Sequence, residues 1–377
     1  MNFSNGGNRV NILVTGANGF IAKNLCQTLS DYGYKDILRY SHQDESLLEE
    51  YTIKSDFIIH LAGVNRPKDD SEFIKGNYEL TKSLVSYIIK HKKNIPIIMS
   101  SSIQAESDTL YGKSKLLAEQ AIKEYSEITG ANTIIYRLPN VFGKWCRPNY
   151  NSVVATFCHN ISRSIPININ DKNSEITLIY IDDLVFDFIK VLKEEGKSGC
   201  TYRTITPSYT TTIGALADTL KTFSKSRETL IMPDMSNQFN KKLYSTYLSY
   251  IDNHDFCRAL NMKKDRRGWL AEVMKSEYSG QIFVSKTSPG VTRGLHYHYT
   301  KCEKFLVVSG LALIKFKNIA TQEIIEYTVD GKELILIDSP VGYIHTITNI
   351  GESELITIFW ANEIFDRDNP DTYIGEI

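Results

Sequence analysis

The N-terminal part of this chain contains the sequence Arg9-Val-Asn-Ile-Leu-Val-Thr-Gly16-Ala-Asn-Gly19-Phe-Ile-Ala22, which indicates its fold. A short β-branched run ends directly at Gly16, and a segment with helical spacing follows it. Gly16 permits a tight turn, and Gly19 lets a pyrophosphate approach the backbone where the helix begins. Ala22 replaces a third glycine, whose position only has to pack the helix against the strand. The stretch therefore predicts the first strand, turn and helix of a dinucleotide-binding fold.

Further strands alternate with helices along the first two-thirds of the chain. The predicted strands are 36–40, 56–63, 96–100 and 133–139, and the clearest helical stretches are 77–92 and 111–130. This alternation predicts an α/β, Rossmann-type doubly wound parallel sheet. Ligands of such sheets bind beyond the carboxyl ends of the strands, where Asn18, Ala62-Gly63 and Ser100-Ser-Ser102 are expected.

A candidate catalytic set follows the fourth strand. Ser100-Ser-Ser102 ends that strand, and Tyr111-Gly-Lys-Ser-Lys115 lies on the next helix. Tyrosine and lysine four residues apart share one helix face, and a neighbouring ammonium lowers the pKa of a phenol. A serine hydroxyl can then hold the substrate oxygen that gains or loses the proton. Tyr-x-x-x-Lys also arises by chance on helix faces, but its place after a serine-tipped strand predicts catalysis.

Together these motifs resemble the extended short-chain dehydrogenase/reductase family, which acts mostly on nucleotide-sugars. The motifs are Gly16-x-x-Gly19-x-x-Ala22, Asp56-Phe-Ile-Ile-His-Leu-Ala-Gly63, Ser100-Ser-Ser102, Tyr111-x-x-x-Lys115, Arg137-Leu-Pro-Asn140-Val-Phe-Gly143 and Tyr180-Ile-Asp-Asp183. The resemblance favours Ser102 as the catalytic hydroxyl beside Tyr111 and Lys115, with Ser101 as the near alternative.

The resemblance also implies which residues contact the cofactor and the substrate. The expected cofactor-binding residues are Gly16, Asn18, Gly19, Phe20, Ile21, Ser41, His42, Leu61, Ala62, Gly63, Tyr111, Lys115 and Leu138. The expected substrate-binding residues are Ser102, Asn140 and Arg66.

Two departures from the family pattern narrow the chemistry. Dehydratases of this family carry an Asp-Glu pair after the catalytic hydroxyl, whereas Ile103-Gln104 stands here. NAD enzymes usually end the second strand with an acidic residue for the ribose hydroxyls. Here the strand ends Arg39-Tyr-Ser-His42, and Asp36 stands too early to reach the ribose. A basic and hydroxylic end suits a 2′-phosphate, so NADP(H) and a net reduction are predicted.

Composition sets the outer limits of the prediction. A chain of 377 residues suggests two or three domains at roughly 150 residues each. A net charge of −1 and a pI near 6.7 leave no basic field for nucleic acid or anionic lipid. We expect no membrane span, because no apolar run approaches the required length. A polar N-terminus and six scattered cysteines, without a Cys-x-x-Cys pair, favour free thiols and a cytoplasmic location.

The last third of the chain changes to short β-branched strands separated by glycine or polar turns. The predicted strands are 280–285, 304–309, 311–316, 323–329 and 355–360. Many short strands at regular spacing predict an all-β jelly-roll barrel. We place the boundary near residue 258, which gives an N-terminal domain of 1–258 and a C-terminal domain of 259–377.

Four side chains of this region form a candidate metal site. His296 and His298 are two apart on a predicted strand, so both point to one face. Glu303 follows across a turn, and His345 comes from a separate hairpin. Three imidazoles and one carboxylate suit zinc, and they also accept iron, nickel or manganese.

The two metal-ligand motifs resemble those of the cupin superfamily. Gly290-x5-His296-x-His298-x4-Glu303-x6-Gly310 fits the first motif, and Pro340-x-Gly342-x2-His345-x3-Asn349 fits most of the second. The glycine expected before the proline is displaced, since Gly331 lies too far back, and this indicates a longer turn.

Over its whole length the chain resembles bifunctional capsular polysaccharide synthesis enzymes, which join a reductase to a cupin. Further matching stretches are His60-Leu-Ala-Gly-Val-Asn-Arg-Pro67, Phe142-Gly-Lys-Trp-Cys146, Asn149-Tyr-Asn-Ser152, 243–250 and Asn369-Pro-Asp-Thr-Tyr373. The resemblance implies a UDP-linked 2-acetamido-2,6-dideoxy-4-ketohexose as substrate. The cupin would invert carbon 3 and the reductase would reduce the 4-ketone to UDP-2-acetamido-2,6-dideoxy-L-talose, towards N-acetyl-L-fucosamine in capsule or O-antigen synthesis.

Several alternatives stay open at this point. The metal is either catalytic or a structural clamp of the barrel, and the cupin either epimerises or only stabilises a homodimer. A third reading is a sensor of the NADPH/NADP ratio, which the intact Ser-Tyr-Lys set disfavours. The residues near the metal site that offer an acid or base are Arg293, Tyr297, Lys304 and Tyr343, and the sequence singles out none of them.

Overall fold

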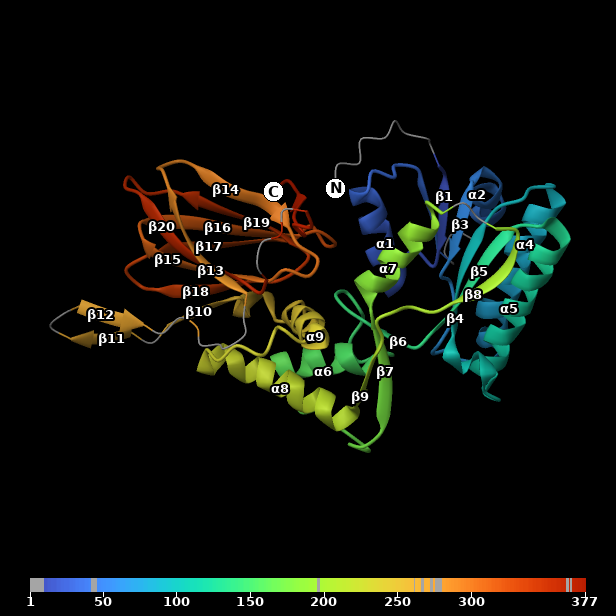
Figure 1. The fold of residues 1–377 in the computed structure, drawn as a ribbon, viewed down its shortest axis with the longest axis horizontal. Coiled ribbons are helices and arrows are strands. Elements are labelled where there is room, and N and C mark those ends of the chain that lie inside the picture. Colours follow the sequence, from blue (N-terminus) through green and yellow to red (C-terminus); the bar gives the residue numbers. More distant parts are fainter. Residues whose placement is uncertain are drawn as a thin grey trace. The chain divides into compact units, whose positions relative to one another are not determined.

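The computed structural model describes residues 10–41, 46–194, 197–260, 262–265, 268–271, 274, 280–363, 366 and 368–377. Contacts between residues divide the chain into two compact units (Figure 1). The N-terminal unit takes the chain up to Val141 together with Thr177–Thr210, and the C-terminal unit takes Phe142–Ile176 together with Thr211–Ile377. The predicted boundary at residue 258 divides the sequence at a single point, whereas each of these units is built from separate segments. The boundary stays a prediction of domain organisation.

A six-stranded parallel sheet forms the centre of the N-terminal unit, in the order β2-β1-β3-β4-β5-β8. Its strands are β1 (Ile12–Thr15), β2 (Ile37–Tyr40), β3 (Phe57–His60), β4 (Ile97–Ser102), β5 (Asn132–Leu138) and β8 (Gly199–Arg203). Every pairing in it is parallel, which confirms the predicted doubly wound fold. All five predicted strands are present, and β8 is the strand that the sequence did not reveal.

Helices cover both faces of this sheet (Figure 1). They are α1 (Phe20–Asp31) and α7 (Ile181–Val191) on one face, and α2 (Leu48–Lys54), α4 (Leu80–Lys90) and α5 (Leu110–Thr129) on the other. Shorter turns are α3 (Ser71–Phe73), the π-helix η2 (Ile74–Glu79) and the 3₁₀-helix η3 (Ile103–Glu106).

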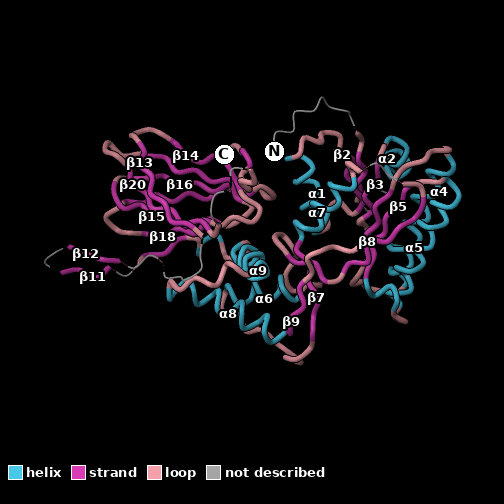
Figure 2. Tube along the Cα trace, viewed as in Figure 1, coloured by secondary structure: helices cyan, strands magenta, loops and turns pink. Residues whose placement is uncertain are grey.

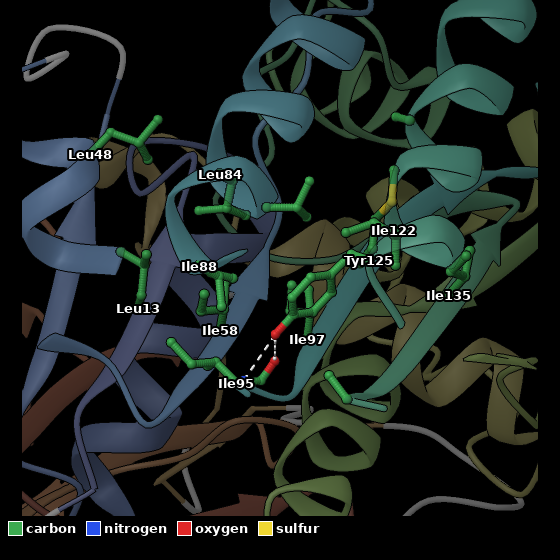
Figure 3. Packing of buried hydrophobic residues seen from close by; sticks show 14 of the residues in the cluster. Leu13, Leu48, Ile58, Leu84, Ile88, Ile95, Ile97, Ile122, Tyr125 and Ile135 are labelled. Atoms are coloured by element: carbon green, nitrogen blue, oxygen red, sulfur yellow. Dashed lines mark hydrogen bonds between the residues drawn. The ribbon is translucent and has the colours of Figure 1, made fainter. Parts of the chain in front are cut away.

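The core between the sheet and α4 and α5 is mostly aliphatic (Figure 3). Its buried side chains alternate along the strands, as Ile97 and Met99 do on β4, and recur on α4 at Leu84 and Ile88. The hydroxyl of Tyr125 accepts a hydrogen bond from the Ile95 N–H and donates one to the Ile95 carbonyl, each at 2.9 Å. This buried polar group is therefore satisfied, and α5 is tied to the entry of β4.

The C-terminal unit contains two five-stranded antiparallel sheets, in the orders β10-β18-β15-β20-β13 and β17-β16-β19-β14-β21. Their strands are β10 (Cys257–Ala259), β13 (Gln281–Thr287), β14 (Thr292–Tyr297), β15 (Glu303–Ser309), β16 (Leu311–Asn318), β17 (Ile324–Asp330), β18 (Ile335–Ser339), β19 (Tyr343–Asn349), β20 (Leu355–Ala361) and β21 (Tyr373–Ile374). This architecture confirms the predicted jelly-roll barrel (Figure 2).

No ranges are predicted from the sequence for the remaining helices and strands. They are α6 (Val153–Ser162), α8 (Ile213–Thr229), α9 (Gln238–Leu248) and the 3₁₀-helix η4 (Asn253–Asp255), with the strands β6 (Asn140–Phe142), β7 (Glu175–Tyr180), β9 (Tyr209–Thr212), β11 (Met262–Asp265) and β12 (Gly268–Ala271). Helix α9 contacts the barrel, because Ser245 Oγ donates to the Thr300 carbonyl at 2.8 Å.

The six cysteines carry free thiols. Among the residues that the structure describes, none of the helices has both the length and the apolar character needed to cross a lipid bilayer.

Candidate functional site

The turns after β1 and β3 lie in contact and shape the predicted cofactor site. Gly16 has φ +68°, and a Cβ atom there would lie 2.8 Å from the Ala62 Cα atom. Both the backbone conformation and the close approach therefore require glycine. Gly19 caps helix α1 without a side-chain hydrogen bond, and the first turn holds no acidic residue. The N–H groups of Phe20 and Ile21 can thus bind a pyrophosphate, so these residues fit a dinucleotide.

A buried histidine fixes the turn after β3. Thr15 Oγ1 accepts hydrogen bonds from the N–H groups of Leu61 and Ala62, each at 3.1 Å. Its own hydrogen therefore goes to His60 Nδ1 at 2.8 Å, and His60 Nε2–H donates to Thr81 Oγ1 at 2.9 Å. Burial lowers the pKa of His60 to about 3, so the ring is neutral. His60 is therefore a support of the predicted cofactor loop, which the sequence did not single out.

The structure brings Ser102 and Tyr111 together. Ser102 ends β4, and its hydroxyl is a hydrogen-bond partner of the Tyr111 phenol. The Ser102 oxygen also accepts from the Gln104 N–H at 3.2 Å. Burial raises the pKa of Tyr111, and the bond to Ser102 opposes this to a smaller extent. The expectation of a lowered pKa for Tyr111 is wrong for this structure, because burial of the phenol outweighs the neighbouring groups.

Lys115 lies one helical turn beyond Tyr111, against the predicted cofactor loop. Its ammonium donates to the Ser100 carbonyl at 3.2 Å, and a Cβ atom at Gly63 would lie 2.9 Å from Nζ. Burial lowers the pKa of Lys115 to about 8, and the carboxylate of Glu119 opposes this shift. The side chain thus stays largely protonated at neutral pH while being buried beside the predicted cofactor loop.

Ser101 has a different role from Ser102. Its hydroxyl donates to Glu119 Oε1 at 2.5 Å, and the Glu119 side chain is almost fully buried. The same carboxylate binds Arg137 through Nε at 3.0 Å and Nη2 at 2.8 Å, and it accepts from the Tyr202 hydroxyl at 3.0 Å. This engagement favours Ser102 as the catalytic hydroxyl. Sequence reasoning missed Glu119, although an acid one turn after Lys115 was a visible signal.

Of the two residues predicted at the adenosine end of the cofactor site, the structure describes Ser41 but not His42. Ser41 is buried directly after β2, where the Ala17 N–H donates to the Tyr40 carbonyl at 2.9 Å. This bond brings the end of β2 against the glycine-rich turn, in which Asn18 is exposed. His42 lies outside the described residues, so its predicted role stays a prediction.

The other predicted contact residues follow β3 and β5. Leu138 is buried at the end of β5 and pairs in register with Ser102. Asn140 begins β6 and is exposed, and Arg66 is exposed in the segment after β3. Leu138 therefore lies beside Ser102 of the candidate catalytic set, whereas substrate contacts of Asn140 and Arg66 stay predictions.

The four predicted metal ligands converge in the C-terminal unit. His296 lies on β14, His298 follows directly after that strand, and His345 lies on the paired strand β19. Glu303 begins β15 in the other five-stranded sheet. One ligand atom from each residue lies within 4.8 Å of the others. Glu303 Oε2 is 3.2 Å from His345 Nε2 and 3.5 Å from His298 Nε2.

A β-bulge in β14 turns its histidines towards this centre. The register with β19 shifts between Gly294 and His296, and Leu295 has φ +62°. Gly294 has φ +99°, and a Cβ atom there would lie 2.5 Å from the His345 carbonyl oxygen. Glycine is therefore required at Gly294, and the bulge re-aims the side chains that follow it.

The donor set fits a divalent cation. His298 Nε2 is buried and makes no hydrogen bond, which is unusual for a buried ring nitrogen. His345 directs Nε2 towards Glu303, while its Nδ1 lies 3.2 Å from Ser339 Oγ. A hydrogen bond on the far nitrogen fixes the ring of a metal-binding histidine. Imidazole nitrogens with one carboxylate are typical of zinc sites.

The protonation states fit metal binding as well. Burial lowers the pKa of His296 to about 4 and also lowers the pKa of His345, so both rings are neutral at pH 7. Burial alone would raise the pKa of Glu303, but the contacts of its carboxylate with the neighbouring side chains lower it below its usual range. Neutral imidazoles and an ionised carboxylate are the forms that bind a metal.

Two of the four candidate acids or bases have structural partners on the flanks of β14. Arg293 Nε donates to Thr287 Oγ1 at 2.9 Å. The Tyr297 ring stacks on Tyr373 with ring centres 5.6 Å apart, and it belongs to a buried hydrophobic cluster. Their surroundings explain both residues as packing and support.

The other two candidates are also engaged elsewhere. Lys304 is buried and ion-paired with Asp338, which also lies 3.2 Å from Arg227. The Tyr343 hydroxyl donates to Asn253 Oδ1 at 3.0 Å. Both side chains therefore have partners other than the four predicted metal ligands.

Two family models match the chain. The model of the NAD dependent epimerase/dehydratase family matches residues 12–203, and that of the polysaccharide biosynthesis C-terminal domain matches residues 263–373. The chain therefore belongs to the NAD dependent epimerase/dehydratase family and continues into the second domain. Membership indicates an enzyme that uses a nicotinamide cofactor.

Individual relatives match over nearly the whole chain. The UDP-2-acetamido-2,6-beta-L-arabino-hexul-4-ose reductase of Pseudomonas aeruginosa strain PA103 is 45% identical over 97% of this chain and 99% of its own length. The crystal structure of the capsular polysaccharide assembling protein CapF from Staphylococcus aureus is 43% identical, with a TM-score of 0.65, over 97% of this chain and 100% of that one. These matches confirm the predicted whole-chain resemblance.

A more distant structure shares the fold alone. UDP-glucose 4-epimerase from Thermotoga maritima, solved with UDP-glucose, is 23% identical with a TM-score of 0.51. The match covers 57% of this chain and 82% of that one.

Proposed function

We propose that this chain is a bifunctional nucleotide-sugar enzyme. Its N-terminal unit reduces the 4-ketone of a UDP-2-acetamido-2,6-dideoxy-4-ketohexose with NADPH, and its C-terminal metal centre epimerises carbon 3. The product is UDP-2-acetamido-2,6-dideoxy-L-talose, which leads towards N-acetyl-L-fucosamine for capsule or O-antigen. The observation that carries the proposal is the contact of Ser102 with Tyr111 one helical turn before the buried Lys115. The reductase from Pseudomonas aeruginosa supports the substrate class.

The reductase step follows from these three side chains. When bound, the nicotinamide supplies the hydride that forms the new C–H bond at the ketone carbon. The Ser102 hydroxyl holds the ketone oxygen, and the Tyr111 O–H bond breaks as its proton passes to that oxygen. The ammonium of Lys115 then favours the phenolate that remains, and solvent restores the proton.

The preference for NADPH rests on the end of β2. Ser41 offers a hydroxyl there, and the stretch Arg39-Tyr-Ser-His42 holds no acid that would repel a 2′-phosphate. Replacing Ser41 with aspartate is expected to favour NADH, measured as the ratio of kcat/KM for the two cofactors. An unchanged ratio would contradict this part of the proposal.

The epimerase step uses the acidity that the 4-ketone gives to the hydrogen at carbon 3. When bound, a divalent cation supplies positive charge that favours an enolate. His296, His298, Glu303 and His345 would hold this cation. Inversion follows if the proton leaves from one face and returns to the other, and the subsequent reduction removes the ketone and so traps the product.

A second candidate role for the metal centre is structural. Its ligands come from both five-stranded sheets, and a site with four protein ligands is typical of structural zinc. Under this alternative, the enzyme is an NADPH-dependent nucleotide-sugar reductase whose barrel serves for stability or for dimerisation.

The test is the reaction of the full chain with the 4-keto substrate and NADPH, followed by NMR of the product. The proposal predicts a 4-hydroxyl sugar whose ring couplings show inversion at carbon 3. A reduced product that keeps the configuration of carbon 3 would support the reductase alone. Oxidation of NADPH that persists undiminished in Tyr111→Phe would contradict the assigned proton donor.

A further inference from the structure

The C-terminal segment Pro370–Thr372 reaches the candidate metal centre. His298 Nδ1 lies 2.5 Å from the main-chain oxygen of Asp371. A carbonyl oxygen only accepts, so the hydrogen of this bond belongs to His298 Nδ1. In the neutral ring, which is the form that binds a metal, the lone pair is then on Nε2, the buried nitrogen that makes no hydrogen bond and faces Glu303. One main-chain carbonyl thus selects the tautomer of a predicted ligand.

The side chain of the same residue holds the turn that links His298 to Glu303. Asp371 Oδ1 accepts from the Tyr299 N–H at 3.1 Å. Asp371 Oδ2 accepts from the Thr300 N–H at 2.8 Å, the Lys301 N–H at 2.7 Å and the Thr300 hydroxyl at 2.9 Å. Three consecutive N–H groups therefore converge on one carboxylate, directly after the ligand His298.

The turn after His298 also binds the segment Pro370–Thr372 through Lys301. Lys301 Nζ donates to the Pro370 carbonyl at 2.7 Å and bonds Thr372 Oγ1 at 3.1 Å. Asp371 itself has φ +38°, in the left-handed region that residues other than glycine seldom adopt. The contacts of Pro370 and Thr372 with Lys301 stabilise this conformation. In it, the Asp371 carbonyl contacts the His298 ring and the Asp371 carboxylate contacts the turn after His298.

We propose that Asp371 is a positioning residue of the metal centre. Its carbonyl sets the tautomer and orientation of His298, and its carboxylate sets the turn that spaces His298 from Glu303. This inference rests on the proposed metal site and gives a physical reason for the matching stretch Asn369-Pro-Asp-Thr-Tyr373. Replacing a group that hydrogen-bonds to a metal ligand commonly changes metal affinity about 10- to 100-fold.

A simpler alternative is that Asp371 only docks the C-terminal segment onto the barrel. Docking alone would lower the stability of the metal-free protein and leave its zinc affinity unchanged. The two roles therefore differ in a quantity that does not depend on turnover.

The experiment compares Asp371→Asn with Asp368→Asn in the full chain. Asparagine keeps the main-chain carbonyl but turns one acceptor oxygen into a donor that faces other donors. Asp368 is exposed in the same segment, so its variant is matched in charge. Zinc affinity is measured by competition with a chromophoric chelator, and ligand geometry by the visible absorption of the cobalt-substituted protein. We expect the zinc dissociation constant of Asp371→Asn to rise about 10- to 100-fold with altered cobalt bands. The control is expected to match the parent chain.

An unchanged zinc affinity and cobalt spectrum in folded Asp371→Asn would overturn the inference. If that variant does not fold, Thr300→Val decides, because it removes one of the four bonds to the carboxylate. One of four bonds is a quarter of the free energy of a 10- to 100-fold effect, so the dissociation constant is expected to rise about two- to threefold, and no rise overturns the inference. A parent chain that does not bind zinc at this site would instead refute the proposed metal centre itself.

Discussion

Replacing Ser102 with alanine tests the assignment of the catalytic hydroxyl. The hydroxyl is proposed to hold the ketone oxygen as negative charge develops on it. Loss of one such donor slows the chemical step about 100- to 1000-fold, or about 2.7–4 kcal/mol. The fold should tolerate the change, because the other partner of Ser102 is the N–H of the exposed Gln104. A lost cap of this kind costs about 1 kcal/mol of stability.

The matched control is Ser101→Ala. Its hydroxyl donates to the buried Glu119, which keeps its bonds to Arg137 and Tyr202 in the variant. A lost hydrogen bond to a buried charged group costs about 1.5–3 kcal/mol. Ser101→Ala is therefore expected to lower stability more than Ser102→Ala does, while kcat changes only slightly.

The assay is single-turnover oxidation of NADPH by each variant with the 4-keto substrate, together with urea denaturation. We expect opposite rankings: Ser102→Ala has the larger loss of rate, and Ser101→Ala has the larger loss of stability. A loss of rate in Ser101→Ala that equals the loss in Ser102→Ala would refute the assignment.

Three further predictions concern charge and metal. Because burial lowers the pKa of Lys115 to about 8, the ammonium is present below that pH and is lost above it. The reductase rate should therefore fall above pH 8, and Lys115→Arg should move that fall to higher pH. If the pH of the fall is the same in Lys115→Arg, titration of Lys115 does not cause it. Asp338→Ala leaves the buried Lys304 without its partner and is expected to cost about 3–5 kcal/mol in denaturant unfolding. Adding Lys304→Met should recover much of this loss, and a single variant as stable as the parent chain would contradict the buried pair. Chelation of the metal should lower the thermal midpoint, and zinc at about 100 times its dissociation constant should restore about 2.7 kcal/mol. A midpoint insensitive to chelator and zinc would argue against the site.

The local parts of both sites were predictable from the sequence. Gly16 and Gly19 predict a turn together with the strand and helix patterns directly beside them. Tyr111 and Lys115 lie close together because they are one helical turn apart. The metal ligands were found because His296, His298 and Glu303 are close in sequence and His345 lies in a second motif of known spacing. Buried β-branched runs predicted the central strands in the same local way.

The supports of these sites were not predictable, because they come from distant segments. Asp371 reaches a turn about 70 residues earlier in the chain, and Arg137 meets Glu119 across 18 residues. The pKa of Tyr111 was misjudged for a related reason. The sequence displays the neighbouring charge of Lys115, but the burial that raises this pKa exists only in the folded unit.

The proposed function places two chemistries at two sites of one chain. The most direct test is deuterium incorporation at carbon 3 of the 4-keto substrate in deuterated water, measured for the full chain, Tyr111→Phe and His345→Ala. We expect Tyr111→Phe to keep the exchange while it loses NADPH oxidation, and we expect His345→Ala to lose the exchange. Exchange that survives in His345→Ala after zinc removal, or that disappears in Tyr111→Phe, would contradict the proposed function.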